Sequence, residues 1–189
     1  SSMQLSDPIK GFSFNRSGPL DMRFSGTGSL TAAEIVNSYR EKDIADIIFR
    51  FGEERRSRKI ASAIVARRPL ETTTQLAKVV EDCLGRSRGR RHPATRTFQA
   101  LRIAVNGEIG NVARGIKEGI NLLQLGGRIV VISYHSIEDR VVKNSFRDES
   151  ALCICPPELP ICDCQHEPKI KFVNRRVKRP SPSEVKRNP

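Results

Sequence analysis

The sequence predicts an α/β fold that also contains a separate all-helical part. The first observation is the apolar, β-branched run at residues 128–133, which is typical of a buried strand. The second is a polar cluster at residues 134–140, directly after this run. Ligands of open α/β sheets bind at the carboxyl ends of strands, so this cluster is the predicted functional site. The third is a row of amphipathic helix patterns between residues 30 and 92.

The first half of the chain combines a loop with short helices. Residues 1–29 are rich in glycine and proline, but large apolar residues are interleaved, so we expect a packed loop. Thr31 and Glu34 have capping-box spacing and predict a helix to about Tyr39. Three more helices are expected, over 43–51 with its end at Gly52, over 53–67, and from Thr73 or Thr74 to Gly85.

Helices also surround the predicted strand in the second half. Pro93 suits the first turn of a helix over 93–106, and another helix is expected over 109–123. One face of the helix over 93–106 is a polar stripe, formed by Thr95, Gln99, Arg102 and Asn106. Such a stripe suits contacts with a substrate or another domain, and the alternative is a face turned to water. A helix through 138–148 and a strand at 169–173 complete the pattern.

Basic residues dominate the charge of the chain. The net charge is +12 over 189 residues, and basic residues gather at 50–59, 67–68, 86–91 and 169–179. Such blocks indicate a polyanionic partner, above all nucleic acid, although a solvated basic surface is the alternative. No apolar run approaches the roughly 18 residues of a membrane span, so no membrane partner is expected.

Five cysteines without a visible secretory signal favour thiols or metal ligands over a disulfide framework. Four of them have CxC-x6-CxC spacing: Cys153, Cys155, Cys162 and Cys164. This cluster could hold one tetrahedral zinc ion, although CxxC is the usual spacing, and His166 could replace one thiol. Reduced surface thiols or an opportunistic disulfide are the alternatives. Cys83 is expected in a helical core.

The polar cluster after the predicted strand combines basic, acidic and hydrogen-bonding groups. His135 and Ser136 are the catalytic candidates, because a side chain at a strand end can accept a proton or a hydrogen bond. A lone histidine is more often structural, and that alternative stands. Glu138 and Asp139 favour the start of a helix, and Arg140 either pairs with them or binds an anion.

Four stretches together resemble one family. They are SSMQL at 1–5, GFSF at 11–14 with GPLDMR at 18–23, HPATRTFQALR at 92–102, and SYHSIEDR at 133–140. The region 39–66 is also similar, with Phe51 before Gly52 where the family has tyrosine. The chain thus resembles the ribosomal RNA small subunit methyltransferase H family, also called the MraW family.

The resemblance implies an S-adenosylmethionine-dependent enzyme that methylates N4 of a cytosine in small-subunit ribosomal RNA. It also implies a Rossmann-like methyltransferase fold with an inserted helical domain. We therefore expect the end of the N-terminal part at 1–29, the insert at 30–92, and the C-terminal part with its cysteine-rich loop and basic tail at 93–189.

The resemblance assigns further site residues. Ser1 and Ser2 match the end of a family motif and become catalytic candidates, and Gln4 matches a cofactor contact. The family's glycine-rich cofactor loop is expected before Ser1, so this partial chain is expected to be inactive alone. The RNA-binding candidates are Arg88, Arg90, Arg91, Arg96, Arg102 and Arg140.

The expected partner is small-subunit ribosomal RNA or the ribosomal subunit. The expected compartment is the cytoplasm, with a chloroplast or mitochondrion as the alternative, and nothing indicates the oligomeric state. The alternative function is a non-catalytic RNA-binding or ribosome-associated module, with or without a stabilising zinc ion.

Overall fold

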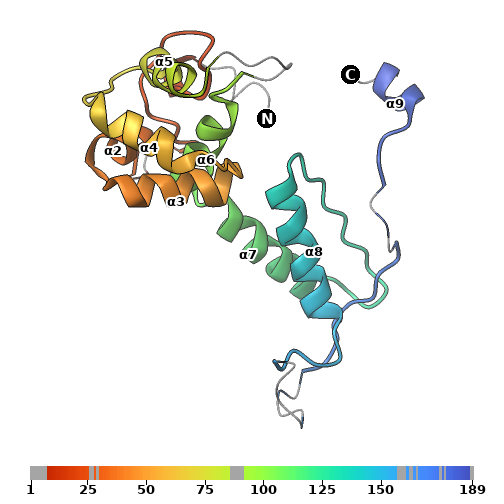
Figure 1. Cartoon of the computed structure of the whole chain (residues 1–189). Coiled ribbons are helices and arrows are strands. Elements are labelled where there is room, and N and C mark those ends of the chain that lie inside the picture. The colour runs from red at the N-terminus through yellow and green to blue at the C-terminus, as the bar shows by residue number, and fades with distance from the viewer. Residues whose placement is uncertain are drawn as a thin grey trace. The chain divides into compact units, whose positions relative to one another are not determined.

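The computed structural model describes residues 8–25, 28, 30–85, 92–156, 161, 164, 166–174, 176 and 178–187. Figure 1 shows the elements in chain order. They are η1 (Pro8–Lys10), α2 (Ala32–Ser38), α3 (Glu41–Gly52), α4 (Ser57–Ala66), α5 (Thr73–Leu84), α6 (Thr95–Asn106), α7 (Glu108–Asn121), α8 (Ser136–Ser150) and α9 (Pro182–Arg187). The chain divides into two compact units, Ser1–Gly110 (unit 1) and Asn111–Pro189 (unit 2).

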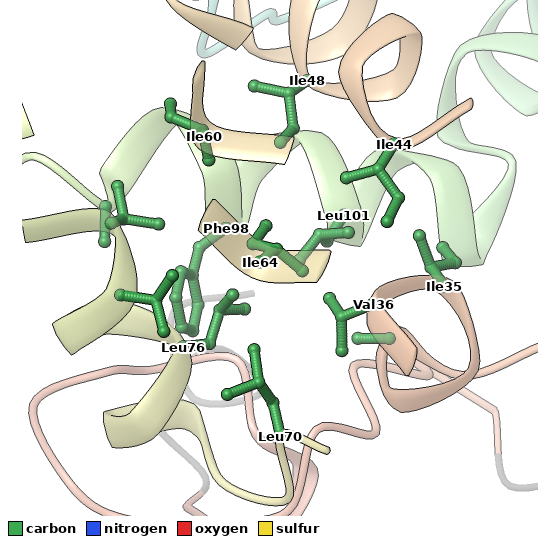
Figure 2. Packing of buried hydrophobic residues seen from close by; sticks show 14 of the residues in the cluster. Ile35, Val36, Ile44, Ile48, Ile60, Ile64, Leu70, Leu76, Phe98 and Leu101 are labelled. Atoms are coloured by element: carbon green, nitrogen blue, oxygen red, sulfur yellow. The ribbon is translucent and has the colours of Figure 1, made fainter. Parts of the chain in front are cut away.

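Unit 1 is built on one apolar core to which α2–α6 all contribute. Figure 2 shows side chains from these helices pointing toward one another. The core includes Ile35, Val36, Ile44, Ile48, Ile60, Ile64, Leu76, Phe98 and Leu101. The pairs on α3 and α4 are four residues apart, so they lie on one face of each helix. Each fully buried aliphatic side chain contributes roughly 1.5–3 kcal/mol to folding.

The helix starts of unit 1 follow their capping residues. The Oγ1 atom of Thr31 accepts a hydrogen bond from Glu34 N at 3.2 Å, which confirms the predicted start of α2. The predicted start of α5 at Thr73 is also confirmed. There Thr72 accepts from Gln75 N at 3.2 Å, while Gln75 Oε1 accepts from Thr72 N at 3.0 Å. This reciprocal pair satisfies two backbone N–H groups that have no partner inside the helix.

The turn between α3 and α4 corrects two details of the prediction. Helix α3 ends at Gly52 as expected, but Glu53 takes the left-handed conformation, with φ of 50°. Gly52 instead permits a close approach, because a Cβ atom there would lie 2.6 Å from the carbonyl oxygen of Arg96 on α6. The predicted helix start at Glu53 is wrong, since α4 begins only at Ser57. The Glu54 carboxylate accepts from Arg56 N at 2.9 Å and stabilises a turn there.

The loop before α2 is packed, as predicted. Phe12, Leu20 and Met22 are buried. Asn106 at the end of α6 holds this loop: its Nδ2 atom donates to Met22 O at 2.7 Å, and its Oδ1 atom accepts from Phe24 N at 2.8 Å. This member of the predicted polar stripe therefore binds the loop of its own unit rather than water.

Unit 2 lacks the predicted strands in the part that the structure describes. Residues 128–133 form neither helix nor strand, and Val130 and Ile132 are 85% and 76% exposed. The prediction of a buried strand is therefore wrong for this chain, because a strand needs neighbouring strands that the described residues do not supply. For the same reason the α/β, Rossmann-like class is not confirmed. Among the described residues, β pairing is limited to one isolated antiparallel bridge, between Pro19 and Thr72.

The strand predicted at 169–173 is also wrong. This segment lies against the end of α8, where Lys169 N donates to Glu149 O at 2.9 Å. The rings of Phe172 and Phe146 meet edge to face, with centroids 6.3 Å apart. The backbone N–H of Lys169, which would pair with a neighbouring strand in a sheet, therefore donates to a carbonyl at the end of α8 instead.

Two further findings concern organisation. Helix α6 packs on α3, so unit 1 extends beyond residue 92 to Gly110. The predicted division at 1–29, 30–92 and 93–189 stays a prediction.

Within the described residues, no helix is both long enough and apolar enough to cross a membrane.

Candidate functional site

The predicted polar cluster lies at the N-terminus of α8. His135 caps this helix, since its Nδ1 atom accepts a hydrogen bond from Glu138 N at 3.3 Å. Its Nε2 atom lies 3.2 Å from Glu138 Oε1, and the other carboxylate oxygen accepts from Tyr134 N at 3.0 Å. Both side chains are mostly buried, at 15% and 19% exposure. His135 thus caps α8, and the Glu138 carboxylate binds the backbone N–H of the residue before it.

This geometry assigns a tautomer to His135. A ring nitrogen that accepts from a backbone N–H carries no proton, so neutral His135 holds its proton on Nε2. This buried Nε2 atom lies 3.2 Å from Glu138 Oε1 but makes no hydrogen bond in the described structure. The lone pair on Nδ1 is then used by the helix cap. The imidazole can serve a substrate amine as acceptor only when it leaves this bond, and its predicted catalytic role stays a prediction.

The other described members of the cluster lie on the outside of α8. Ser136 and Arg140 are exposed, and both take part in interactions. Asp139 pairs with Lys143 at 2.6 Å, one helical turn further on. Ser136 is thus accessible where α8 begins, which is compatible with its predicted role.

Arg96 and Arg102, two predicted RNA contacts, have partners inside unit 1. Arg102 binds Glu108 through two hydrogen bonds, at 2.8 and 3.0 Å, and its side chain is only 20% exposed. Arg96 lies 3.4 Å from the buried carboxylate of Glu54 and remains half exposed. The sequence did not predict either glutamate as a partner, because their spacings from these arginines follow no helical period.

Several predicted site residues lie outside the described part of the chain. They are Ser1, Ser2, Gln4, Arg88, Arg90, Arg91 and Cys162. Their roles as catalytic, cofactor-binding, RNA-binding or metal-binding residues stay predictions.

Exposed basic side chains are nevertheless available on unit 1. Arg55, Arg58 and Lys59 at the start of α4 are all exposed. Arg50 at the end of α3 lies over the ring of Phe51, with 5.7 Å between the guanidinium carbon and the ring centroid. These residues belong to the basic block at 50–59 of the sequence. Such exposed cations can contact phosphates without reading a base.

A hollow of about 300 Å³ in unit 1 does not fit the implied cofactor. Tyr39 carries the one polar side chain among its lining residues, which are Leu30, Ile35, Tyr39, Ile47, Phe51, Ile103, Ala104, Gly107, Ile109 and Gly110. S-adenosylmethionine carries a carboxylate, an ammonium, a sulfonium and hydroxyl groups, all of which require polar partners when buried. We therefore derive no cofactor contact from this hollow.

Three of the four clustered cysteines meet in unit 2. The sulfur atoms of Cys153, Cys155 and Cys164 all lie within 4.8 Å of one another. His166 is engaged elsewhere, since its Nε2 atom lies 2.9 Å from Asp148 O. The sequence thus identified the thiols that gather, and the structure separates His166 from them.

Comparisons with known proteins agree with the resemblance. Two strains of Dehalococcoides mccartyi contain proteins named ribosomal RNA small subunit methyltransferase H, which are 52% and 53% identical to this chain over all 189 residues. A protein of the same name from Thermomicrobium roseum is 52% identical over 192 aligned residues. The chain spans 54%, 54% and 59% of these relatives, respectively. The family model described as MraW methylase family matches residues 1–189, and the chain therefore belongs to this family.

Proposed function

We propose that this chain is part of an S-adenosylmethionine-dependent enzyme that methylates N4 of a cytosine in small-subunit ribosomal RNA. The observation that carries the proposal is the identity of 52–53% over the whole chain to proteins named as methyltransferases of that RNA. The exposed basic side chains Arg55, Arg58 and Lys59 support it, because they offer phosphate contacts on unit 1.

The chemistry sets a requirement for the site. A cytosine amine is a weak nucleophile, because its lone pair is delocalised into the ring. Side chains that accept its hydrogen bonds localise this lone pair, and they must also hold the nitrogen in line with the methyl group. When bound, S-adenosylmethionine supplies the electrophilic methyl group. In our proposal, His135 together with Ser1 and Ser2 provides the acceptors.

The test uses a version of the chain extended to the length of its relatives. Transfer of labelled methyl groups to small-subunit ribosomal RNA is followed by nucleoside mass spectrometry. We expect the label in N4-methylcytidine. Label in another nucleoside contradicts the N4 assignment, and no transfer contradicts the enzyme assignment.

Two substitutions separate catalysis by His135 from its role as a helix cap. His135→Ala removes both the imidazole and the helix cap. His135→Asn removes the imidazole but retains the cap, because asparagine is a good N-cap residue. If the imidazole acts on the substrate, both variants lower the methylation rate about 10²-fold or more, with a smaller effect on cofactor affinity. A wild-type rate in His135→Asn would show that His135 is structural.

A non-catalytic RNA-binding module is the second candidate, favoured by the net charge of +12. The extended version of the chain distinguishes the two functions. RNA binding that weakens steeply with salt, by both the chain and its extended version, is expected under either function. Cofactor binding by the extended version occurs only if it is an enzyme, and we expect little or none by the 189-residue chain.

A further inference from the structure

The thiols that gather after α8 are not used by the proposed methyl transfer. Cys153 and Cys164 are eleven positions apart in the chain, yet their sulfur atoms lie 3.8 Å from one another. Cys155 N lies 3.4 Å from the sulfur of Cys153, in the geometry of a hydrogen bond. This bond folds the first CxC into a tight turn, so that two thiols from one end of the loop meet a third from the other end.

These distances suit a metal ion held by thiolates. A zinc–sulfur bond is about 2.3 Å long, so two sulfur atoms on one edge of a tetrahedron are roughly 3.8 Å apart. The separation of Cys153 and Cys164 matches that edge. The cluster consists of thiols without a carboxylate, which favours zinc over the hard cations magnesium and calcium.

His166 and Cys162 are not counted among the ligands. His166 faces the carbonyl oxygen of Asp148 at the end of α8, at 2.9 Å, and is not a member of the thiol cluster. Cys162 lies outside the described residues. The assignment therefore rests on three thiols whose positions the structure gives.

The surroundings show what an ion would stabilise. Three buried apolar side chains support the described part of unit 2: Ile116, Ile120 and Ile137. After the thiols the chain returns to α8, where Lys169 N donates to Glu149 O at 2.9 Å. An ion bound by the thiols would link Cys164 to Cys153 and Cys155. The free energy of binding the ion would add to the stability of a unit with a small core.

We propose that Cys153, Cys155 and Cys164 are three ligands of a structural zinc ion that links the segment after α8, which carries Cys153 and Cys155, to Cys164. Each thiol releases its proton to solvent when its sulfur binds the metal. This site is independent of the proposed methyl transfer.

The test is metal analysis of the 189-residue chain, purified under reducing conditions, exposed to zinc sulfate and desalted. We expect about one zinc per chain, which falls below about a fifth in Cys153→Ser, Cys155→Ser and Cys164→Ser. Cys83→Ser, on α5 of unit 1, is the matched control and retains the full amount. Less than about half an equivalent in the unaltered chain overturns the proposal. Full retention in the three variants does so too.

A second measurement does not depend on the folding of the variants. Cobalt(II) added to the unaltered chain should give sulfur-to-metal charge-transfer absorption and the intense visible bands of a tetrahedral site. Zinc sulfate should then displace the cobalt and remove this absorption. A cobalt spectrum without a sulfur-to-metal transition would show that the thiols are not ligands, and it would overturn the assignment.

Discussion

Unit 1 and unit 2 differ most in the apolar surface that they bury. All but three of the buried apolar side chains in the described structure lie in unit 1. Large apolar side chains that are exposed have the opposite distribution. Ile9 and Phe49 lie in unit 1, and all the other exposed large apolar side chains of the described structure lie in unit 2. Unit 1 therefore has the core of an independent helical domain. Unit 2 has helices with little to pack against, and a unit of that kind depends on further chain, a metal ion or a partner.

The largest difference should appear on truncating one apolar side chain in each unit. Leu101 on α6 is fully buried, so Leu101→Ala should lower the free energy of unfolding by about 2–5 kcal/mol. Ile132 in unit 2 is 76% exposed, so Ile132→Ala should change it by less than about 0.5 kcal/mol. Urea unfolding followed by circular dichroism measures both. Equal losses would contradict the contrast between the units.

A smaller difference is expected between two helical glycines. In unit 1, Gly52→Ala should cost about 1–3 kcal/mol, because the new Cβ atom would meet Arg96 O at 2.6 Å. In unit 2, Gly115 on α7 has open space around the position of a Cβ atom, so Gly115→Ala should stabilise its helix by up to about 1 kcal/mol. Thermal unfolding of both variants measures the two signs. A stabilising Gly52→Ala would refute the close packing of α3 on α6.

The smallest effect concerns acid sensitivity in the loop of unit 1. Arg23 donates to the carboxylate of Asp21 from Nε at 2.8 Å and from Nη2 at 2.7 Å, and these side-chain hydrogen bonds lower the pKa of Asp21. Because the folded pKa lies below the unfolded value of about 3.9, the pair stabilises the fold above that pH. This contribution is lost as the pH falls through the folded pKa. Asp21→Asn should therefore lower the melting temperature at neutral pH.

The pH dependence of melting checks this expectation. The difference between Asp21→Asn and the unaltered chain should disappear in acid, where Asp21 is protonated in both states. Asp139→Asn in unit 2 is the control, since its i,i+4 ion pair with Lys143 lies at the helix surface and is worth little. A difference that persists below the folded pKa of Asp21 would show that the hydrogen bonds, and not the charge, matter.

The helices of unit 1 were predictable because each carries a local signal. The cap at Thr31 and the apolar spacing along α3 both depend on residues close together in the sequence. The run at 128–133 carries an equally clear local signal for a strand, yet it forms none. Sheet formation depends on partners distant in sequence, and composition alone does not show whether they are present.

The candidate site was predictable to a similar extent. The sequence placed His135 at a strand end and the start of a helix near Glu138, whereas His135 is the N-cap of α8, which begins at Ser136. It did not show that the backbone N–H of Glu138 would bind Nδ1 while its carboxylate lies beside Nε2, because that arrangement depends on side-chain rotamers. The pairing of Arg102 with Glu108 was not predictable for another reason, because it depends on the left-handed turn at Gly107 between α6 and α7.

The uncovered segment at 128–134 has a consequence for handling the chain in solution. Its outward residues Val130, Ile132 and Tyr134 are all at least 76% exposed and alternate with half-buried ones, as in a strand with one face uncovered. Such a row is a template for β pairing between copies, so we expect the purified chain to self-associate as its concentration rises. A lysine in place of Val130 should suppress this association in light scattering, without disturbing the helical core of unit 1.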